Sequence, residues 1–340
     1  MRTLTIGFLC LLGWVSGLTG LPAEDAALHI APIGDLPLEN GDTLHQCQVG
    51  YRTVGRLNQD SSNVIIYPTW FAGRSDMIIG LLKPDKLFDP DGYYIIIFDA
   101  LGNGVSSSPS NYPGRFPSIT IGDMVQSQYR VITKTLGLKR IYGAIGGSMG
   151  SMQVFEWVRA YPDMIAKAVP YVCTPRPSSY DRINWHIRKT IIETGRRHGI
   201  PDRQIQYQLK LEDIQQSRSP DYYVEMVKPE AVDSILAFEP FRPDSLFTID
   251  NYYTQLQAMI EHDIFRHDPS MLEGARRIKT RILMIVSMTD HLVNPEPAMA
   301  LARLNHYPVL MLTNNRGHLG ISPEFGLCRT TIQSFFSKEH

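Results

Sequence analysis

The stretch Ile145-Gly146-Gly147-Ser148-Met149-Gly150-Ser151-Met152 places a serine two residues from a glycine on either side. An apolar run at residues 140–145 leads into it, and apolar residues at helical spacing follow as far as Tyr161. The pattern predicts a strand, a tight turn and a helix, with Ser148 at the tip of the turn. Glycines suit the flanking positions because so sharp a turn leaves no room for side chains. A plain glycine- and serine-rich loop is the alternative.

A serine hydroxyl is a weak nucleophile at neutral pH, so it needs a histidine that is oriented by a carboxylate. In sheets with such a turn the order is serine, acid, histidine, each in a loop after a strand. Asp290 follows the apolar run 281–287, and His318 follows the run 308–312. We therefore expect a catalytic triad of Ser148, Asp290 and His318. A helix cap is the alternative role for Asp290, and a surface position is the alternative for His318.

Acyl transfer also needs N–H donors for the oxyanion of the tetrahedral intermediate. The backbone N–H of Met149, at the start of the predicted helix, is one expected donor. The second is expected from the loop after the strand at 63–67, with Trp70 as the first choice and Phe71 as the alternative. Both rings are expected to exclude water and to narrow the acyl pocket, so Phe71 is also a predicted substrate-binding residue.

Composition narrows the classes of partner. The chain has 340 residues, 43% of them hydrophobic, which is enough for one large core or two smaller ones. A net charge of −1 provides no field to attract nucleic acid, so a small-molecule acyl substrate is expected. No cysteine and histidine spacing resembles a zinc site, and Gly102-Asn103-Gly104 lacks the third glycine of a dinucleotide-binding loop. We expect no metal and no cofactor.

The N-terminal residues 1–23 have the three zones of a secretory signal peptide, with an apolar core at residues 6–15. That core is too short to span a bilayer comfortably. A periplasmic or secreted protein without membrane contact after leader removal is expected, and an uncleaved anchor is the alternative. Removal leaves Cys47, Cys173 and Cys328, which allow one disulfide but no disulfide framework.

Apolar runs that alternate with helical patterns predict an α/β chain with a doubly wound, mostly parallel sheet. A helix is expected from Asp123, as its cap, to Leu136, and a closing helix from about Pro323 to Phe336. The expected strands cover residues 44–54, 63–67, 93–98, 140–145, 166–172, 281–287 and 308–312.

Residues 174–278 differ in character from the rest, with few strand-like runs and several helical patterns interrupted by prolines. We expect them to form a helical lid or cap, here called the insertion, on a core of residues 24–173 and 279–340. A homodimer formed through this lid is a further expectation.

The chain resembles the α/β-hydrolase superfamily, and within it the homoserine O-acetyltransferase-like proteins. Residues 146–153 are close to that family's Gly-Gly-Ser-Met-Gly-Gly-Met-Gln elbow, and residues 51–58, Asn184 and Arg188 add to the likeness. The resemblance implies an α/β-hydrolase fold and acyl transfer through an acyl-serine intermediate. In that family an aspartate suited to hold the amino group of homoserine follows the catalytic histidine, whereas Leu319 follows His318 here.

The expected function is therefore a serine-dependent carboxylic ester hydrolase. Ser148 attacks the acyl carbon, His318 takes and returns the proton, and Asp290 orients the imidazole. Without an acid after His318, the ammonium of an amino-acid acceptor would be buried unpaired, so water is the expected acceptor. An O-acyltransferase of the homoserine O-acetyltransferase type and a non-catalytic binding protein with the same fold are the alternatives.

Overall fold

The computed structural model describes residues 26–237 and 247–337. The predicted leader, residues 1–23, lies outside the described residues. Within the described part of the chain, no helix is both long and apolar enough to cross a membrane.

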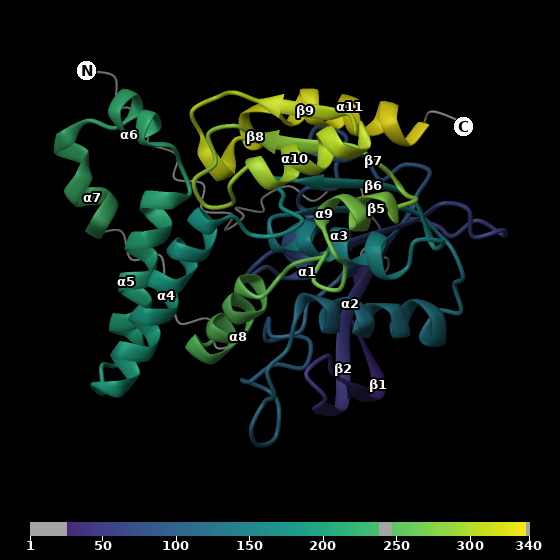
Figure 1. Ribbon diagram of the computed structural model, residues 1–340, viewed down its shortest axis with the longest axis horizontal. Helices are drawn as coiled ribbons and strands as arrows, with labels where there is room; N and C mark the ends of the chain where they lie inside the picture. The colour runs from purple at the N-terminus through teal and green to yellow at the C-terminus, as the bar shows by residue number, and fades with distance from the viewer. Residues whose placement is uncertain (1–25, 238–246, 338–340) are drawn as a thin grey trace.

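A sheet forms the centre of the fold (Figure 1). In the described residues it has nine strands, in the order β1, β2, β4, β3, β5, β6, β8, β9, with β7 beside β6. Pairing is antiparallel between β1, β2 and β4, and parallel from β4 through β3 to β9. The predicted mostly parallel sheet is confirmed. The strands are β1 (His29–Pro37), β2 (Thr43–Val54), β3 (Val64–Pro68), β4 (Tyr94–Phe98), β5 (Ile141–Gly147), β6 (Ile165–Tyr171), β7 (Arg281–Ile282), β8 (Met284–Ser287) and β9 (Val309–Leu312).

Both faces of the sheet are covered, because successive residues of a strand point to opposite faces. In β4, Ile96 and Phe98 join the hydrophobic cluster under α2 (Ile121–Arg130), α3 (Met149–Ala160) and α10 (Glu296–Asn305). Ile95 and Ile97 join the second cluster, which includes residues of α1 (Ser75–Ile79) and α11 (Phe325–Ser337). The continuous apolar run of this strand is therefore explained by burial on both sides.

One local prediction needs correction, and one open question is answered. The helix expected from Asp123 begins at Ile121, because Thr120 is its cap and Asp123 completes the capping box from inside the helix. After Arg130 it continues as a π-helical turn, Val131–Thr135. The disulfide that the sequence leaves open is not formed among the described residues, since Cys47, Cys173 and Cys328 are all buried and free.

Between β6 and β7 the described residues form helices, in the stretch for which a helical insertion is expected. In Figure 1 the helices α4 to α7 stand to the left of the sheet. That they act as a lid stays a prediction. These helices are α4 (Ser179–Arg197), α5 (Asp202–Gln216), α6 (Pro220–Met226), α7 (Val232–Ala237), α8 (Ile249–Ile260) and α9 (Met271–Arg276).

Candidate active site

Ser148 is the single residue that connects β5 to α3, and its backbone has φ 54° and ψ −126°. A positive φ is uncommon for a residue other than glycine, and such backbone strain is concentrated at functional sites. The Ser148 N–H donates to the carbonyl of Tyr171 at the end of β6, at 3.2 Å. The strand, turn and helix expected around Ser148 are therefore present, with the serine at the turn.

Three glycines allow this turn to form. A Cβ on Gly146 would lie 2.6 Å from the Gly150 carbonyl oxygen, and one on Gly147 would lie 2.0 Å from the ring of Tyr171. A Cβ on Gly150 would lie 2.7 Å from the carbonyl oxygen of Pro68. The neighbours of Gly146 and Gly150 are backbone atoms, which cannot move aside cheaply, and the Tyr171 ring beside Gly147 is buried. Close approach rather than loop flexibility therefore requires these glycines.

Asp290 and His318 form a hydrogen-bonded pair. The Nδ1 of His318 lies 2.7 Å from Oδ2 of Asp290, and the side chains are only 11% and 1% exposed. The other oxygen of Asp290 accepts the N–H groups of Leu292 and Val293, at 2.8 and 2.9 Å. This carboxylate therefore orients the imidazole with its proton on Nδ1, which leaves Nε2 able to accept a proton. Asp290 does not cap α10, which has no side-chain cap.

The loops that carry Asp290 and His318 are joined to each other. Ser287 donates through its hydroxyl to the Gly317 carbonyl at 2.6 Å, and Thr289 donates to the Asn314 carbonyl at 2.7 Å. Ser148, Asp290 and His318 follow the carboxyl ends of β5, β8 and β9, which lie with β6 in the parallel part of the sheet. Among the described residues, no hydrogen bond links the Ser148 hydroxyl to His318.

The expected oxyanion donors sit in two segments that pack against each other. Within the described residues, no hydrogen bond is formed by the backbone N–H groups of Met149, Trp70 and Phe71. The N–H of Thr69, in contrast, donates to the Phe98 carbonyl at 3.0 Å. Both N–H groups are therefore free to act as the second donor, and Trp70 as first choice with Phe71 as alternative stays a prediction. Their rings differ in surroundings, because Trp70 packs against the α11 side of the sheet and Phe71 against the α3 side.

The Phe71 ring contacts residues at the end of the insertion. Its centroid is 4.6 Å from that of Tyr252 and 6.0 Å from that of Phe247, both nearly perpendicular. The backbone N–H of Ala72 donates to Gln255 of α8 at 2.9 Å. These partners lie about 180 positions further along the chain, and no local sequence pattern connects them to Phe71.

The insertion also packs against the loops that carry Asp290 and His318. Asp181, near the start of α4, accepts the N–H of Asn294 at 2.8 Å. A Cβ on Gly317 would lie 2.7 Å from the Cα of Arg218, between α5 and α6. The residue before His318 therefore lies directly under the insertion.

Arg188, which contributes to the resemblance, is buried inside the insertion and is 3% exposed. Its guanidinium group pairs with Asp213 and donates to the Tyr252 hydroxyl at 3.0 Å and to Gln216 at 3.2 Å. The charge of this arginine is thus balanced within the insertion.

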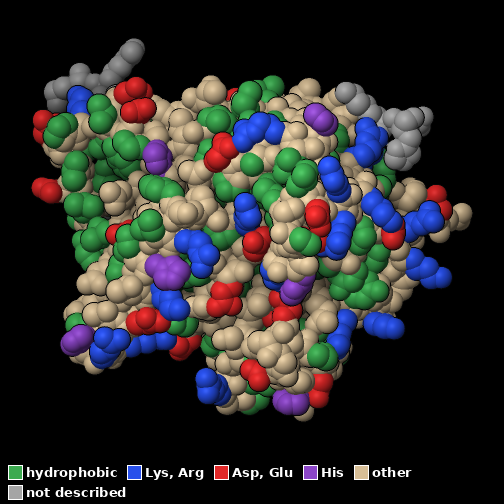
Figure 2. Space-filling view, in the orientation of Figure 1, with side chains coloured by type: hydrophobic (Ala, Val, Ile, Leu, Met, Phe, Trp, Pro, Cys, Tyr) green, Lys and Arg blue, Asp and Glu red, His purple; other side chains and the backbone are tan. Residues whose placement is uncertain are grey.

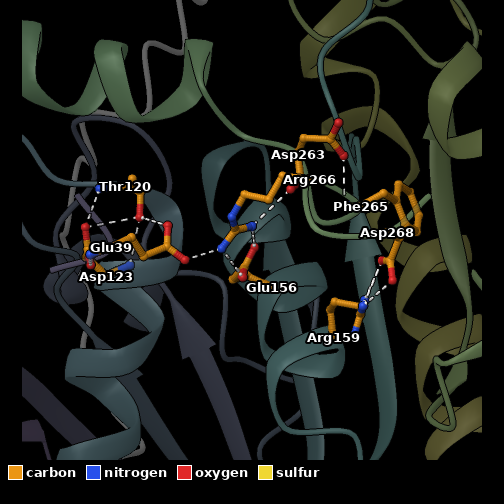
Figure 3. A network of polar contacts seen from close by, with 9 residues as sticks. All are labelled: Glu39, Thr120, Asp123, Glu156, Arg159, Asp263, Phe265, Arg266 and Asp268. Carbon is orange, nitrogen blue, oxygen red and sulfur yellow. Dashed lines mark hydrogen bonds and ion pairs between the residues drawn. The ribbon is translucent and has the colours of Figure 1, made fainter. Parts of the chain in front are cut away.

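Ion pairs hold the helix that begins after Ser148 (Figure 3). Arg266, in the segment after α8, pairs with Glu156 of α3 at 2.9 Å and with Glu39. Two residues further on, Asp268 accepts from Arg159 of α3 at 2.7 Å. The chain that returns from the insertion is therefore fastened to α3.

Comparison with known proteins indicates the same fold as the sheet and the elbow. The family model described as alpha/beta hydrolase fold matches residues 63–188. A probable esterase of Corynebacterium glutamicum is 36% identical over 160 residues, which cover 45% of this chain and 46% of that protein. An ethyl acetate hydrolase of Pseudomonas veronii is 37% identical over 155 residues, 44% of each. These matches span less than half the length of either hydrolase.

A homoserine O-acetyltransferase of Chlorobium chlorochromatii matches over a longer stretch, with 29% identity over 88% of this chain and 92% of that protein. Solved structures of both kinds of enzyme cover 92% of this chain. An acetylester hydrolase from Corynebacterium glutamicum has a TM-score of 0.81, 24% identity and 96% of its own chain covered. A homoserine O-acetyltransferase from Bacillus anthracis has a TM-score of 0.76, 20% identity and 98% covered.

The sheet, the elbow and these matches define an α/β-hydrolase-fold protein, so the expected fold is confirmed. Within that fold its particular likeness is to esterases and homoserine O-acetyltransferases, which confirms the resemblance drawn from the elbow. The likeness also agrees with the expectation of an enzyme of the hydrolase or acyltransferase kind.

Proposed function

We propose that this protein is a serine-dependent carboxylic ester hydrolase that works through an acyl-serine intermediate. The observation that carries the proposal is the 2.7 Å contact between His318 Nδ1 and Asp290 Oδ2. A histidine oriented in this way is the base that a serine nucleophile needs, and Ser148 stands at a strained turn in the same parallel sheet.

In the proposed reaction the imidazole takes the proton of the Ser148 hydroxyl as the oxygen attacks the acyl carbon. The same imidazole then returns the proton to the leaving alkoxide, and Asp290 stabilises the imidazolium in between. The N–H groups of Met149 and Trp70 receive the oxyanion. In the second half, water attacks the acyl-enzyme with His318 again as the base, which releases the acid and restores Ser148.

Two observations favour water and simple esters over an amino-acid acceptor. Leu319 follows His318 and offers no charge to hold an ammonium group. Arg188 in the insertion is already paired with Asp213, so it is not an open site for a carboxylate. The face drawn in Figure 2 carries both basic and acidic side chains, with Lys and Arg more frequent toward its right-hand edge. A small, weakly charged acyl ester is the proposed substrate.

A homoserine-type O-acyltransferase is the second candidate. The likeness to homoserine O-acetyltransferases along 88% of the chain favours it. Incubation of the protein with an activated acetyl donor and a mixture of water, homoserine and simple alcohols separates the two by mass spectrometry. Free acetate as the main product supports the hydrolase, and an acetylated acceptor supports the transferase.

The decisive test compares the wild type with Ser148→Ala on p-nitrophenyl acetate. Removal of the nucleophile is expected to lower kcat by at least about 10³-fold, with the far-UV circular dichroism unchanged. Labelling of the wild type but not of the variant by a fluorophosphonate probe is the companion result. Equal turnover by both proteins contradicts the proposal. Absence of turnover and of labelling in the wild type favours the non-catalytic alternative.

A further inference from the structure

Three fully buried side chains connect α2, α3 and the segment before Trp70. The indole Nε1 of Trp157 donates to Gln128 Oε1 at 2.8 Å, and Gln128 Nε2 donates to Gln153 Oε1 at 2.6 Å. Gln153 Nε2 then donates to the Thr69 carbonyl at 2.9 Å and to the Met149 carbonyl at 3.3 Å. All three side chains are 0% exposed, so water does not compete for these bonds.

The direction of this relay is set at both ends. An indole N–H can only donate, and a backbone carbonyl can only accept. Gln128 must therefore present its oxygen to Trp157 and its NH₂ to Gln153, and Gln153 must present its NH₂ to Thr69. A flip of either amide places two donors or two acceptors face to face in a buried site, which is costly. The side chain of Gln153 is thus held in one orientation.

The carbonyl that Gln153 holds belongs to the same peptide group as the Trp70 N–H. A trans peptide is planar, so its C=O and N–H point in opposite directions, and orienting one orients the other. The rest of Thr69 is also anchored, since its N–H donates to Phe98 and its hydroxyl oxygen accepts the N–H of Ala100 at 3.0 Å. The direction of the Trp70 N–H is therefore decided by this peptide plane.

The same amide reaches the other oxyanion segment. Gln153 Nε2 also contacts the carbonyl of Met149, which lies one peptide unit after the Met149 N–H, the first expected donor. The two segments have no spare room between them, because a Cβ on Gly150 would lie 2.7 Å from the Pro68 carbonyl oxygen. One side chain thus bonds to both of the segments that supply the oxyanion donors.

We propose that Gln153 is a positioning residue for the oxyanion hole, oriented by Gln128 and Trp157, which fixes the direction of the Trp70 N–H and ties its segment to the one that begins at Met149. The proposal rests on the proposed function, since it assigns those N–H groups to an oxyanion. Gln153 acts only through the backbone and touches no substrate.

The test measures kcat and KM for p-nitrophenyl acetate in Gln153→Met, which keeps the volume but loses both donor and acceptor. Loss of an oxyanion donor lowers kcat by about 10²- to 10³-fold, and misalignment of one is expected to cost about tenfold to a hundredfold. KM is expected to stay within about threefold, because the oxyanion exists only in the transition state. The control is Thr280→Val, which removes another buried side-chain bond to a carbonyl, that of Ile165.

Gln153→Glu adds a pH signature. A protonated carboxyl group can accept from Gln128 and donate to Thr69, whereas a carboxylate can only accept. Burial raises the pKa of a carboxyl group. Relative to the wild type, we expect Gln153→Glu to keep more kcat near pH 6 than near pH 9, while Gln153→Met stays low at both. A role in packing alone does not produce this difference.

The outcomes separate the two proposals. If Ser148→Ala loses activity while Gln153→Met keeps kcat within about twofold of Thr280→Val, the positioning role is wrong and the proposed function stands. A change in KM alone, or parallel pH profiles for the wild type and Gln153→Glu, also overturns the role. If Gln153→Met does not fold, Gln128→Met tests the same relay by removing the side chain that orients Gln153. A smaller loss of kcat at constant KM is then expected, and kcat equal to that of the control overturns the proposal.

Discussion

His318 Nδ1 lies 2.7 Å from Oδ2 of Asp290, while Oδ1 of the same carboxylate is held by the N–H groups of Leu292 and Val293. In Asp290→Asn the NH₂ group must face either those amides or Nδ1. Facing the amides places donors against donors, so it is expected to turn to Nδ1. The imidazole proton then moves to Nε2, where a base is needed, and kcat is expected to fall by about 10³- to 10⁴-fold. Steady-state hydrolysis of p-nitrophenyl acetate measures the loss.

The neighbouring His291 provides the matched control for Asp290. Its carbonyl accepts from Asn184, and its ring lies 6.3 Å from that of Tyr180. His291→Gln is expected to keep kcat within about twofold of the wild type. Retention of more than about a tenth of kcat in Asp290→Asn would contradict the orienting role of the acid.

The second prediction concerns the glycines of the elbow. In Gly146→Ala the new Cβ would lie 2.6 Å from the Gly150 carbonyl oxygen, a contact that backbone cannot relieve locally. We expect a loss of at least about 3 kcal/mol in the free energy of unfolding and little remaining activity. Urea denaturation followed by circular dichroism measures the change.

Gly326, in α11, is the matched control for the elbow glycines. A Cβ there has no atom within 4 Å, and the residue is exposed. Gly326→Ala is expected to be neutral or to stabilise by up to about 1 kcal/mol, because alanine favours a helix. Equal stability of the two variants would show that the elbow has room for a side chain.

The third prediction concerns the ion pair between α3 and the segment after α8. Asp268 has a fully buried side chain that is held by Arg159 and, at 3.0 Å, by Arg277. Arg159→Met leaves the carboxylate short of a partner and is expected to cost about 3 kcal/mol in the free energy of unfolding. Adding Asp268→Asn should recover part of that loss in a double-mutant cycle.

A surface pair provides the comparison. Lys279 and Asp163 are 63% and 80% exposed, so Lys279→Met is expected to change stability by less than about 0.5 kcal/mol. If Arg159→Met costs no more than this, the contact drawn in Figure 3 does not hold the elbow helix.

The fourth prediction concerns pH. Burial lowers the pKa of His262 to about 3. The positive charge of Arg266 lowers this pKa as well, and a contact with the backbone of Thr174 raises it by a smaller amount. An unfolded histidine has a pKa of about 6.5, so between about pH 6.5 and pH 3 only the unfolded state binds this proton. The free energy of unfolding should therefore fall as pH is lowered through that window, by up to about 1.4 kcal/mol per unit from this group.

His262→Leu removes that term, so its stability should depend less on pH than that of the wild type. Urea denaturation between pH 7 and pH 4.5 measures the two slopes. Ile264→Val, a change without a titratable group at a nearby buried position, is the control and should leave the slope of the wild type unchanged. Identical slopes in His262→Leu and the wild type would mean that His262 is not buried in neutral form.

Several elements of this protein follow from local sequence. The run Tyr94–Phe98 is apolar at every position, which is typical of a strand buried on both faces. The elbow pattern is equally local, because its glycines and serine lie within five residues, although two of the atoms that exclude a side chain there belong to the distant Tyr171 and Pro68. The positions of Asp290 and His318 after β8 and β9 could also be predicted, since each residue follows its own strand directly.

Other features depend on contacts between distant segments. The edge strand β1 is mostly exposed and contains two prolines and a glycine, so only its pairing with β2 defines it. Thr120 rather than Asp123 caps α2, and that choice also involves the contact of both residues with Glu39.

The sequence by itself determined which local elements form, because strand burial and the tight elbow leave periodic and steric marks within a few residues. Only the tertiary structure decided that Asp290 faces His318, that Phe71 packs on Tyr252, and that Gln128 holds Gln153. The physical reason is that a side chain's partner is set by packing between elements. A glutamine in each of two helices is common, and nothing in the neighbouring sequence indicates that these two side chains will be hydrogen-bonded to each other.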